Sequence, residues 1–324
     1  MSGRRLFLGI DGGGTKTTFV CIDGDRQIVA ATVEGTTYHL QIGLDAVVAV
    51  IRQGVATICG ELGTTPLGLE NIFFGLPAFG EDAVIDPQLE QACRSLLGHD
   101  RYSCGNDMIC GWAGSLGCED GINLVAGTGS IGYGERQGST ARVGGWGEVF
   151  GDEGSAYWIA LQGLNAFTRM SDGRLPIGPL HASLRRAFGL SSDLDICARV
   201  MGTSEMARDE LADLARIVSD AADGGDTVAR QILRRAGLEL ADMAVALRNT
   251  LGFTENESAL LSWSGGVLSN QEIVRDALLE GLGTDRPFTL IAPRYEPGYG
   301  AALYAYKSAQ LASGESVSHR PLRR

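Results

Sequence analysis

Two turns rich in glycine and threonine, each lying between strand-like apolar runs, constrain the fold of this chain more than any other feature. The first turn is Asp11–Lys16, which separates the apolar runs 6–10 and 19–22. Five apolar residues are too few for a helix and suit a buried strand. Glycines without a Cβ let backbone N–H groups approach a ligand, and consecutive N–H groups in such a turn form an anion-binding concavity. This turn is therefore predicted to bind phosphate through Gly13, Gly14, Thr15 and Lys16.

Asp11 ends the first apolar run and would lie against the same anion. A carboxylate beside a phosphate requires a divalent cation between them, so Asp11 is predicted to hold Mg²⁺, which uses few carboxylates and keeps several waters. A hairpin turn that binds nothing is the alternative, although ordinary two-residue turns need fewer glycines. The Walker phosphate loop is excluded, because Thr15 stands where its glycine precedes the lysine and because strand-like residues follow Lys16.

The same arrangement returns at 122–134, where an apolar run, the turn Gly127–Ser130 and a second strand-like segment follow one another. Residues 127–132 also match the dinucleotide fingerprint G-x-G-x-x-G, but that fingerprint requires a following helix and none is indicated. We interpret the segment as a second phosphate hairpin, formed by Gly127, Thr128 and Gly129. Two such half-sites indicate a duplicated domain with nucleotide in the cleft between the copies.

The remaining patterns indicate an α/β protein whose mixed sheets are flanked by helices. The first copy is expected to have three strands in 6–33, a helix at 43–62, a strand at 72–76, a helix around 87–97, a strand at 102–106 and a helix from Met108. The second copy is expected to contain a helical insertion at 179–250, strands at 260–263 and 288–291, and a helix from Asn270 to about 282. A last helix from Gly298 is expected to pack back on the first copy. Asp152 is expected to be the N-cap of a helix that runs to about residue 170.

These elements predict domain boundaries. The first domain is 1–119, joined by the last helix at about 298–312. The second domain is 120–297, and the basic tail 313–324 is expected to be disordered.

Composition indicates a globular enzyme, with 44% hydrophobic and 20% charged residues. A net charge of −12 argues against a nucleic-acid partner. No apolar run approaches a membrane span, and the seven scattered cysteines include no C-x-x-C pair. We expect a cytoplasmic protein with reduced cysteines and a small-molecule substrate.

With these turns, Asn106-Asp107, Gly144–Ser155 and Ser264–Val267 in this order, the sequence resembles the N-acetylglucosamine kinases and bacterial glucosamine kinases. These belong to the superfamily of sugar kinases, heat-shock chaperones and actin. The resemblance extends from residue 6 to about 311, and its most specific part is 144–158. It implies two ribonuclease H-like (actin-like ATPase) domains and transfer of the γ-phosphoryl group of ATP to the 6-hydroxyl of an amino sugar. It also makes a homodimer one expectation.

The resemblance implies roles for particular residues. Asp107 would be the general base for the sugar hydroxyl, although an aspartate before a helix can also serve only as its cap. Thr15, Lys16 and Thr128 would contact the β- and γ-phosphates. The adenosine would be flanked by Gly265, Gly266, Asn270 and Ala222. The sugar would be bound by Tyr38, His39, Asp107, Ser130, Gly145, Trp146, Asp152 and Glu153, with core packing as the alternative for Trp146.

One position departs from the pattern of these kinases. Where they usually carry an asparagine after Ser-Thr, this chain has Tyr38 after Thr36-Thr37. A phenol cannot reproduce the paired donor and acceptor of an amide. The choice between N-acetylglucosamine and glucosamine therefore stays open.

Three other functions are found on this fold. The first, an actin- or chaperone-like assembly ATPase, is disfavoured by the loop Gly144–Ser155. The activator ATPases of benzoyl-CoA reductase and 2-hydroxyacyl-CoA dehydratase hold an iron–sulfur cluster with a cysteine just before the second Gly-Thr-Gly turn, where this chain has Leu124-Val125-Ala126. A non-catalytic sugar sensor is the third alternative, and such a protein would lack the base that Asp107 supplies here.

Overall fold

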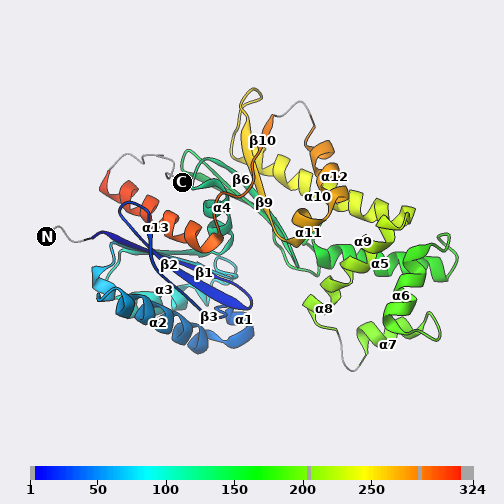
Figure 1. The fold of residues 1–324 in the computed structure, drawn as a ribbon, viewed down its shortest axis with the longest axis horizontal. Coiled ribbons are helices and arrows are strands. Elements are labelled where there is room, and N and C mark those ends of the chain that lie inside the picture. The colour runs from blue at the N-terminus through cyan, green and yellow to red at the C-terminus, as the bar shows by residue number, and fades with distance from the viewer. Residues whose placement is uncertain (1–3, 203–205, 284–286, 315–324) are drawn as a thin grey trace. The chain divides into compact units, whose positions relative to one another are not determined.

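The computed structural model describes residues 4–202, 206–283 and 287–314 (Figure 1). The chain divides into two compact units: unit 1 holds the described residues up to Asp120 and those from Ala292, and unit 2 is Gly121–Ile291. The tail that the sequence predicts to be disordered lies, from residue 315 on, outside the described residues. In the described part of the chain, no helix combines the length and the apolar character needed to cross a membrane.

Unit 1 is built on a five-stranded mixed sheet with the order β3-β2-β1-β4-β5. Its strands are β1 (Leu6–Gly12), β2 (Lys16–Asp23), β3 (Ile28–Gly35), β4 (Asn71–Leu76) and β5 (Tyr102–Asn106). The first three strands pair antiparallel, whereas β4 lies parallel to both β1 and β5. The first strand of the unit is therefore its central strand.

Unit 2 repeats this topology with the order β8-β7-β6-β9-β10. Its strands are β6 (Gly121–Ala126), β7 (Ser130–Arg136), β8 (Ser139–Gly144), β9 (Ala259–Ser264) and β10 (Phe288–Leu290). Again the first strand is central, with an antiparallel hairpin on one side and parallel strands on the other. The prediction of duplicated mixed sheets in an α/β protein is confirmed.

The helices of unit 1 cover both faces of its sheet (Figure 1). They are α1 (His39–Ile42), α2 (Leu44–Glu61), the 3₁₀ turn η1 (Pro66–Gly68), α3 (Asp86–Leu97), α4 (Met108–Leu116) and α13 (Pro297–Ser313). Alternate residues of a strand point to opposite faces. Leu8 and Ile10 of β1 accordingly pack in a core with Val47 and Ile51 of α2, while Phe7 lies 4.9 Å, ring centroid to ring centroid, from Tyr306 of α13.

Helix α13 packs so closely that only glycine fits at two of its contacts. A Cβ on Gly9 of β1 would lie 2.0 Å from the backbone nitrogen of Ala302. A Cβ on Gly300 would lie 2.2 Å from the backbone nitrogen of Gly114 in α4. Helix α13 thus fixes β1, which contains Asp11, and α4, which follows Asp107.

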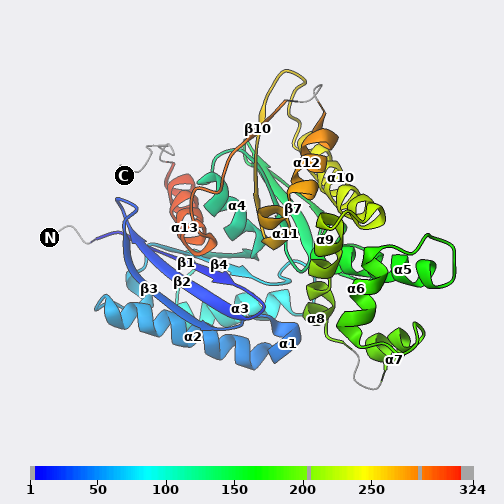
Figure 2. The same ribbon diagram turned by 45° about the vertical axis from the view of Figure 1, so that its right-hand side comes forward.

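The helices of unit 2 include a long insertion between β8 and β9, which the sequence predicts (Figure 2). The unit contains α5 (Ala156–Ser171), α6 (Pro179–Phe188), α7 (Asp195–Met201), α8 (Arg208–Asp213), α9 (Ala215–Asp223), α10 (Thr227–Thr250), α11 (Gly266–Asn270) and α12 (Glu272–Leu282). Leu233, Leu240 and Leu247 recur on one face of α10 and are fully buried in the core that contains Leu124 of β6.

Two predicted helix starts are wrong. Asp152 is not the N-cap of α5, because its φ of 57° is left-handed whereas an N-cap needs extended backbone. Ser155 has that backbone (φ −75°, ψ 169°), and its side chain accepts a hydrogen bond from the N–H of Trp158. Asn270 does not begin a helix but ends α11, where its side-chain amide donates to the carbonyl of Gly266.

Candidate active site

In unit 1, the connection between β1 and β2 is the turn at residues 13–15. A Cβ on Gly12 would lie 2.3 Å from Oγ1 of Thr37, so the strand end approaches its neighbour closely. The hydroxyl of Thr36 donates to the carbonyl of Gly13 at 2.7 Å. Among the described residues, no hydrogen bond occupies the N–H of Gly14 or Thr15, and Lys16 is exposed. The turn therefore offers backbone donors and an ammonium group to an anion.

Asp107 stands directly before α4, yet its side chain makes no capping hydrogen bond. Asn106 does this instead, because its Oδ1 accepts from the N–H of Met108 at 3.1 Å. The same side chain donates to the carbonyl of Phe79 at 3.2 Å and is thereby held in place. Helix α4 consequently does not depend on the carboxylate of Asp107 for its cap.

The Asp11 carboxyl lies at the end of β1 in an environment that disfavours its charge. Burial and then the nearby negative charge of Asp107 raise the pKa of Asp11 to about 7, although a hydrogen bond with Cys110 and the charge of Lys16 act in the opposite direction. The described residues contain no group of three or more His, Cys, Asp and Glu side chains that could hold a metal. Two nearby carboxylates fit Mg²⁺, whose other ligands are waters and substrate phosphates.

The raised pKa gives a prediction for stability. The pKa of Asp11 is 3.8 in the unfolded chain and about 7 in the folded protein. The buried charge therefore does not lower the stability of the fold below pH 3.8. Between pH 3.8 and about 7 it lowers the stability progressively, and above pH 7 the loss is complete. Asp11→Asn should therefore raise the free energy of unfolding on the order of 3 kcal/mol at pH 8, and by less at pH 5. Urea unfolding at both pH values without divalent cations measures this. The exposed Glu61→Gln is the control, and an equal effect of Asp11→Asn at both pH values would contradict the assignment.

In unit 2, the turn at residues 127–129 joins β6 and β7, which is the place that residues 13–15 take in unit 1. The first N–H groups of α5, those of Ala156 and Tyr157, donate to the carbonyls of Gly127 and Thr128 at 2.9 and 3.2 Å. Within the described chain, the N–H groups of Thr128 and Gly129 have no acceptor. The start of α5 thus holds the turn, and two of its backbone donors remain available to an anion.

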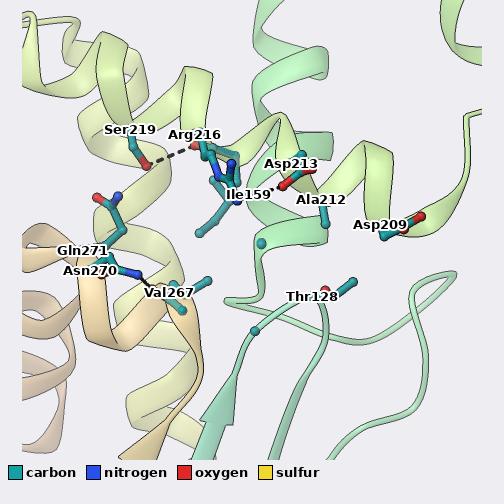
Figure 3. Close-up of a pocket in the computed structure, with 14 residues that line it drawn as sticks. Thr128, Ile159, Asp209, Ala212, Asp213, Arg216, Ser219, Val267, Asn270 and Gln271 are labelled. Carbon is teal, nitrogen blue, oxygen red and sulfur yellow. Dashed lines mark hydrogen bonds and ion pairs between the residues drawn. The ribbon is translucent and has the colours of Figure 1, made fainter. Parts of the chain in front are cut away.

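A cavity of about 570 Å³ lies beside this turn, within the size range of small-molecule sites. Figure 3 shows Asn270 and Gln271 on one side and Asp209 and Ala212 on the other, with Thr128 below. The cavity is lined by Gly127, Thr128, Ala156, Ile159, Asp209, Ala212, Asp213, Ala215, Arg216, Ser219, Gly266, Val267, Asn270 and Gln271.

The cavity brings together four of the residues predicted to bind nucleotide: Gly127, Thr128, Gly266 and Asn270. Gly265 is not part of the lining. It is the N-cap of α11 with a φ of 95°, and a Cβ there would lie 2.4 Å from the carbonyl oxygen of Ala126. Ala222 is not part of the lining either, because it is fully buried in the core of unit 2.

Helices α8 and α9 supply cavity residues that the sequence does not reveal. Asp209 and Asp213 lie one turn apart on α8, and Arg216 of α9 pairs with Asp213 at 3.2 Å. Ser219 follows one turn later. Acidic and basic residues at helical spacing look like an ordinary solvent-facing stripe, so no motif identifies them.

The loop 145–155 brings Ser130, Asp152 and Glu153 together. The hydroxyl of Ser130 donates to the carbonyl of Glu153 at 2.7 Å, and its N–H lies 3.5 Å from Oδ1 of Asp152. Asp152 is only 3% exposed, and its Oδ2 lies 2.5 Å from Nη2 of Arg208. Sequence inspection does not find Arg208, since 56 residues separate it from Asp152.

The other predicted sugar-binding residues differ widely in exposure. Trp146 is 73% exposed, which excludes core packing as its role, and the preceding Gly145 accepts a hydrogen bond from Arg142. Tyr38 is half-buried at the start of α1. His39 is 7% exposed, and both its ring nitrogens lack a hydrogen-bond partner among the described residues.

Comparisons with known proteins identify relatives over nearly the whole chain. The N-acetylmuramic acid/N-acetylglucosamine kinase of Clostridium acetobutylicum is 29% identical over 304 residues, which cover 93% of this chain and 98% of that protein. The N-acetyl-D-glucosamine kinase of Dictyostelium discoideum is 28% identical over 315 residues, 94% of this chain and 99% of that one. A solved structure from Chromobacterium violaceum, described as a candidate N-acetylglucosamine kinase, has a TM-score of 0.68 at 25% identity and covers 93% of this chain and 99% of its own.

The resemblance drawn from the sequence is thereby confirmed, and the two repeated sheets have the architecture of that structural relative. Residues 8–305 match a family whose members are ATPases. The match begins in β1 and ends in α13, so it includes both glycine turns, Asp107 and the loop 145–155. The chain belongs to the BadF/BadG/BcrA/BcrD ATPase family.

Proposed function

We propose that this protein is an ATP-dependent sugar kinase that transfers the γ-phosphoryl group to the 6-hydroxyl of an amino sugar, with N-acetylglucosamine as the first candidate. The observation that carries the proposal is the placement of Asp107. Its carboxylate lies near Asp11 at the end of β1, while Asn106 caps α4 in its stead. The names of the Clostridium and Dictyostelium relatives support the substrate class.

In the proposed reaction, Asp107 accepts the proton of the sugar 6-hydroxyl. The hydroxyl oxygen forms a bond to the γ-phosphorus as the bond between that phosphorus and the bridging oxygen of ADP breaks. ADP leaves with the electron pair of that bond, and the products are the sugar 6-phosphate and ADP. Because phosphoryl transfer needs mainly positioning and charge neutralisation, the role of the protein is to orient the hydroxyl and bind the phosphates.

We assign the triphosphate to the glycine turns. Gly13, Gly14, Thr15 and Lys16 offer donors in unit 1, and Gly127, Thr128 and Gly129 offer donors in unit 2. Asp11 would hold Mg²⁺, which neutralises phosphate charge when bound. The open N–H groups of both turns and the paired carboxylates of unit 1 support this assignment.

We assign the adenosine to the cavity beside the second turn. Gly266 and Asn270 would flank the base, and the carboxylates of Asp209 and Asp213 are suited to accept hydrogen bonds from ribose hydroxyls. The volume of about 570 Å³ and the mixture of apolar and charged lining support a nucleoside as the occupant.

We assign the sugar to polar groups of the loop 145–155 and of the segment that leads into α1. The carboxylates of Asp152 and Glu153 accept from sugar hydroxyls, and the exposed indole of Trp146 offers an apolar ring face. Ser130 and Gly145 contribute backbone contacts, while Tyr38 and His39 would contact the 2-substituent. The orphaned imidazole of His39 supports a polar ligand there.

A coupled assay for ADP release tests the proposal. The substrates are N-acetylglucosamine, glucosamine, glucose and N-acetylmannosamine, each with ATP and Mg²⁺, and ³¹P NMR of the product identifies the phosphorylated oxygen. We expect ADP release to depend on an amino sugar and the product to be a 6-phosphate. Equal ADP release with and without sugar would refute a kinase, and iron in the purified protein would indicate an activator-type ATPase instead.

A further inference from the structure

The guanidinium group of Arg208 lies between two parts of unit 2 that the proposed function gives to different substrates. Its Nη2 lies 2.5 Å from Oδ2 of Asp152, which we assign to the sugar, and its Nε lies 3.2 Å from Oε2 of Glu148. Arg208 is also the first residue of α8, and the next residue, Asp209, lines the cavity assigned to adenosine.

The same guanidinium lies directly over the second glycine turn. A Cβ on Gly129 would be 2.7 Å from Nη2 of Arg208 and 2.8 Å from Oδ2 of Asp152. Any larger residue at position 129 would displace this ion pair. The arginine is therefore in contact with the turn whose N–H groups we assign to phosphate.

Asp152 is buried and needs its ion pair with Arg208, whereas Arg208 itself remains accessible. The side chain of Asp152 is 4% exposed, and a buried carboxylate without a partner is strongly unfavourable. The side chain of Arg208 is 42% exposed, and its Nη1 has no acceptor among the residues that the structure describes. A guanidinium has five N–H donors in a planar fork, so donors remain for a further anion.

We propose that Arg208 binds both substrates at once: it orients the Asp152 carboxylate for the sugar and donates to the terminal phosphates of ATP over Gly129. This inference rests on the proposed function. A guanidinium is well matched to phosphate oxygens, to which it donates charge-assisted hydrogen bonds. Glu148 is 37% exposed and its contact is the longer of the two, so its carboxylate is the partner that a phosphate replaces.

The first experiment measures nucleotide binding without sugar. Isothermal titration with ATP, ADP and AMP is compared for the wild type, Arg208→Met, Arg208→Lys and the control Arg186→Met, an exposed arginine on α6. Loss of a charge-assisted hydrogen bond to the terminal phosphates should weaken the binding of ATP about 10- to 100-fold. The affinity for AMP should change by no more than about threefold. Arg208→Lys should recover part of the ATP affinity, because lysine keeps the charge but not the fork.

The second experiment measures the sugar side. Arg208→Met should raise the KM for sugar as well as that for ATP. In a protein that already carries Asp152→Asn, adding Arg208→Met should change the sugar KM little. Circular dichroism checks that each variant is folded, and Arg208→Lys serves if the methionine variant is not. If Arg208→Met weakens the binding of ATP and AMP equally, or weakens the binding of neither, the inference is overturned and Arg208 is only a structural partner of Asp152.

The two hypotheses fail in distinguishable ways. If the wild type phosphorylates sugar and Arg208→Met leaves the ratio of ATP to AMP affinity unchanged, the inference fails and the kinase assignment stands. If the wild type phosphorylates no sugar but Arg208→Met lowers the ratio of ATP to AMP affinity, the kinase assignment fails and so does the role of Arg208 toward the sugar. Only its contact with phosphate then stands.

Discussion

Asp107→Asn should lower the rate of sugar phosphorylation by about 10²- to 10⁴-fold, the range contributed by a positioned general base. The amide is nearly the same size as the carboxylate but cannot accept a proton at neutral pH. Helix α4 should be unaffected, because Asn106 provides its cap. We expect kcat to fall, while the KM for ATP and the midpoint of urea unfolding change little.

Asn106→Ala is the matched variant at the neighbouring position. It removes the capping oxygen, so it should cost about 1 kcal/mol of stability while leaving the base in place. If Asp107→Asn instead retains most of its activity and loses about that much stability, Asp107 is a structural cap and the catalytic assignment is wrong.

Gly300→Ala should give the largest loss of stability of any variant considered, about 3 kcal/mol or more, as is typical of severe overpacking. The added Cβ would lie 2.2 Å from the backbone nitrogen of Gly114 and 2.4 Å from the carbonyl oxygen of Cys110. These are backbone atoms of α4, so no side chain can rotate away to relieve the clash. Urea unfolding measures the loss, and activity should fall with it because α4 follows Asp107.

Gly60→Ala provides the control for this prediction. Gly60 is also helical, in α2, but a Cβ there would meet no atom within 4 Å. Alanine is a better helix former than glycine, so this variant should gain about 1 kcal/mol. A loss in Gly300→Ala no greater than about 1 kcal/mol would show that α13 can move away from α4 at little cost.

The sequence predicts the sheets well because their determinants are local. Each glycine turn lies between apolar runs of strand length, and the strands of both hairpins appear where those runs predict them. The position of Asp107 between a strand and a helix is local as well, but its role as a base comes from the resemblance to the kinases, since such an aspartate can also serve only as a cap. The sequence predicts neither β8 nor the order of the strands, because the parallel pairings of β1 with β4 and of β6 with β9 join distant segments.

The contents of the candidate site are harder to predict because they depend on distant contacts. Nothing in the sequence links Arg208 to Asp152, or α8 and α9 to the turn at 127–129, because the folded insertion alone brings them together. The sequence also gives the wrong N-cap for α5. Both Asp152 and Ser155 are good capping residues by type, and only the backbone angles of the folded chain decide between them.

The contribution of α13 to unit 1 has a consequence for the order of events during biosynthesis. Unit 2 is one continuous segment, whereas β1 to β5 and α4 are completed by a helix that is translated after all of unit 2. Until α13 emerges from the ribosome, Phe7 and Phe73 lack their aromatic partners Tyr306 and Tyr304. The nascent chain therefore presents an uncovered apolar sheet face for most of its synthesis, which is the kind of surface that molecular chaperones exist to protect.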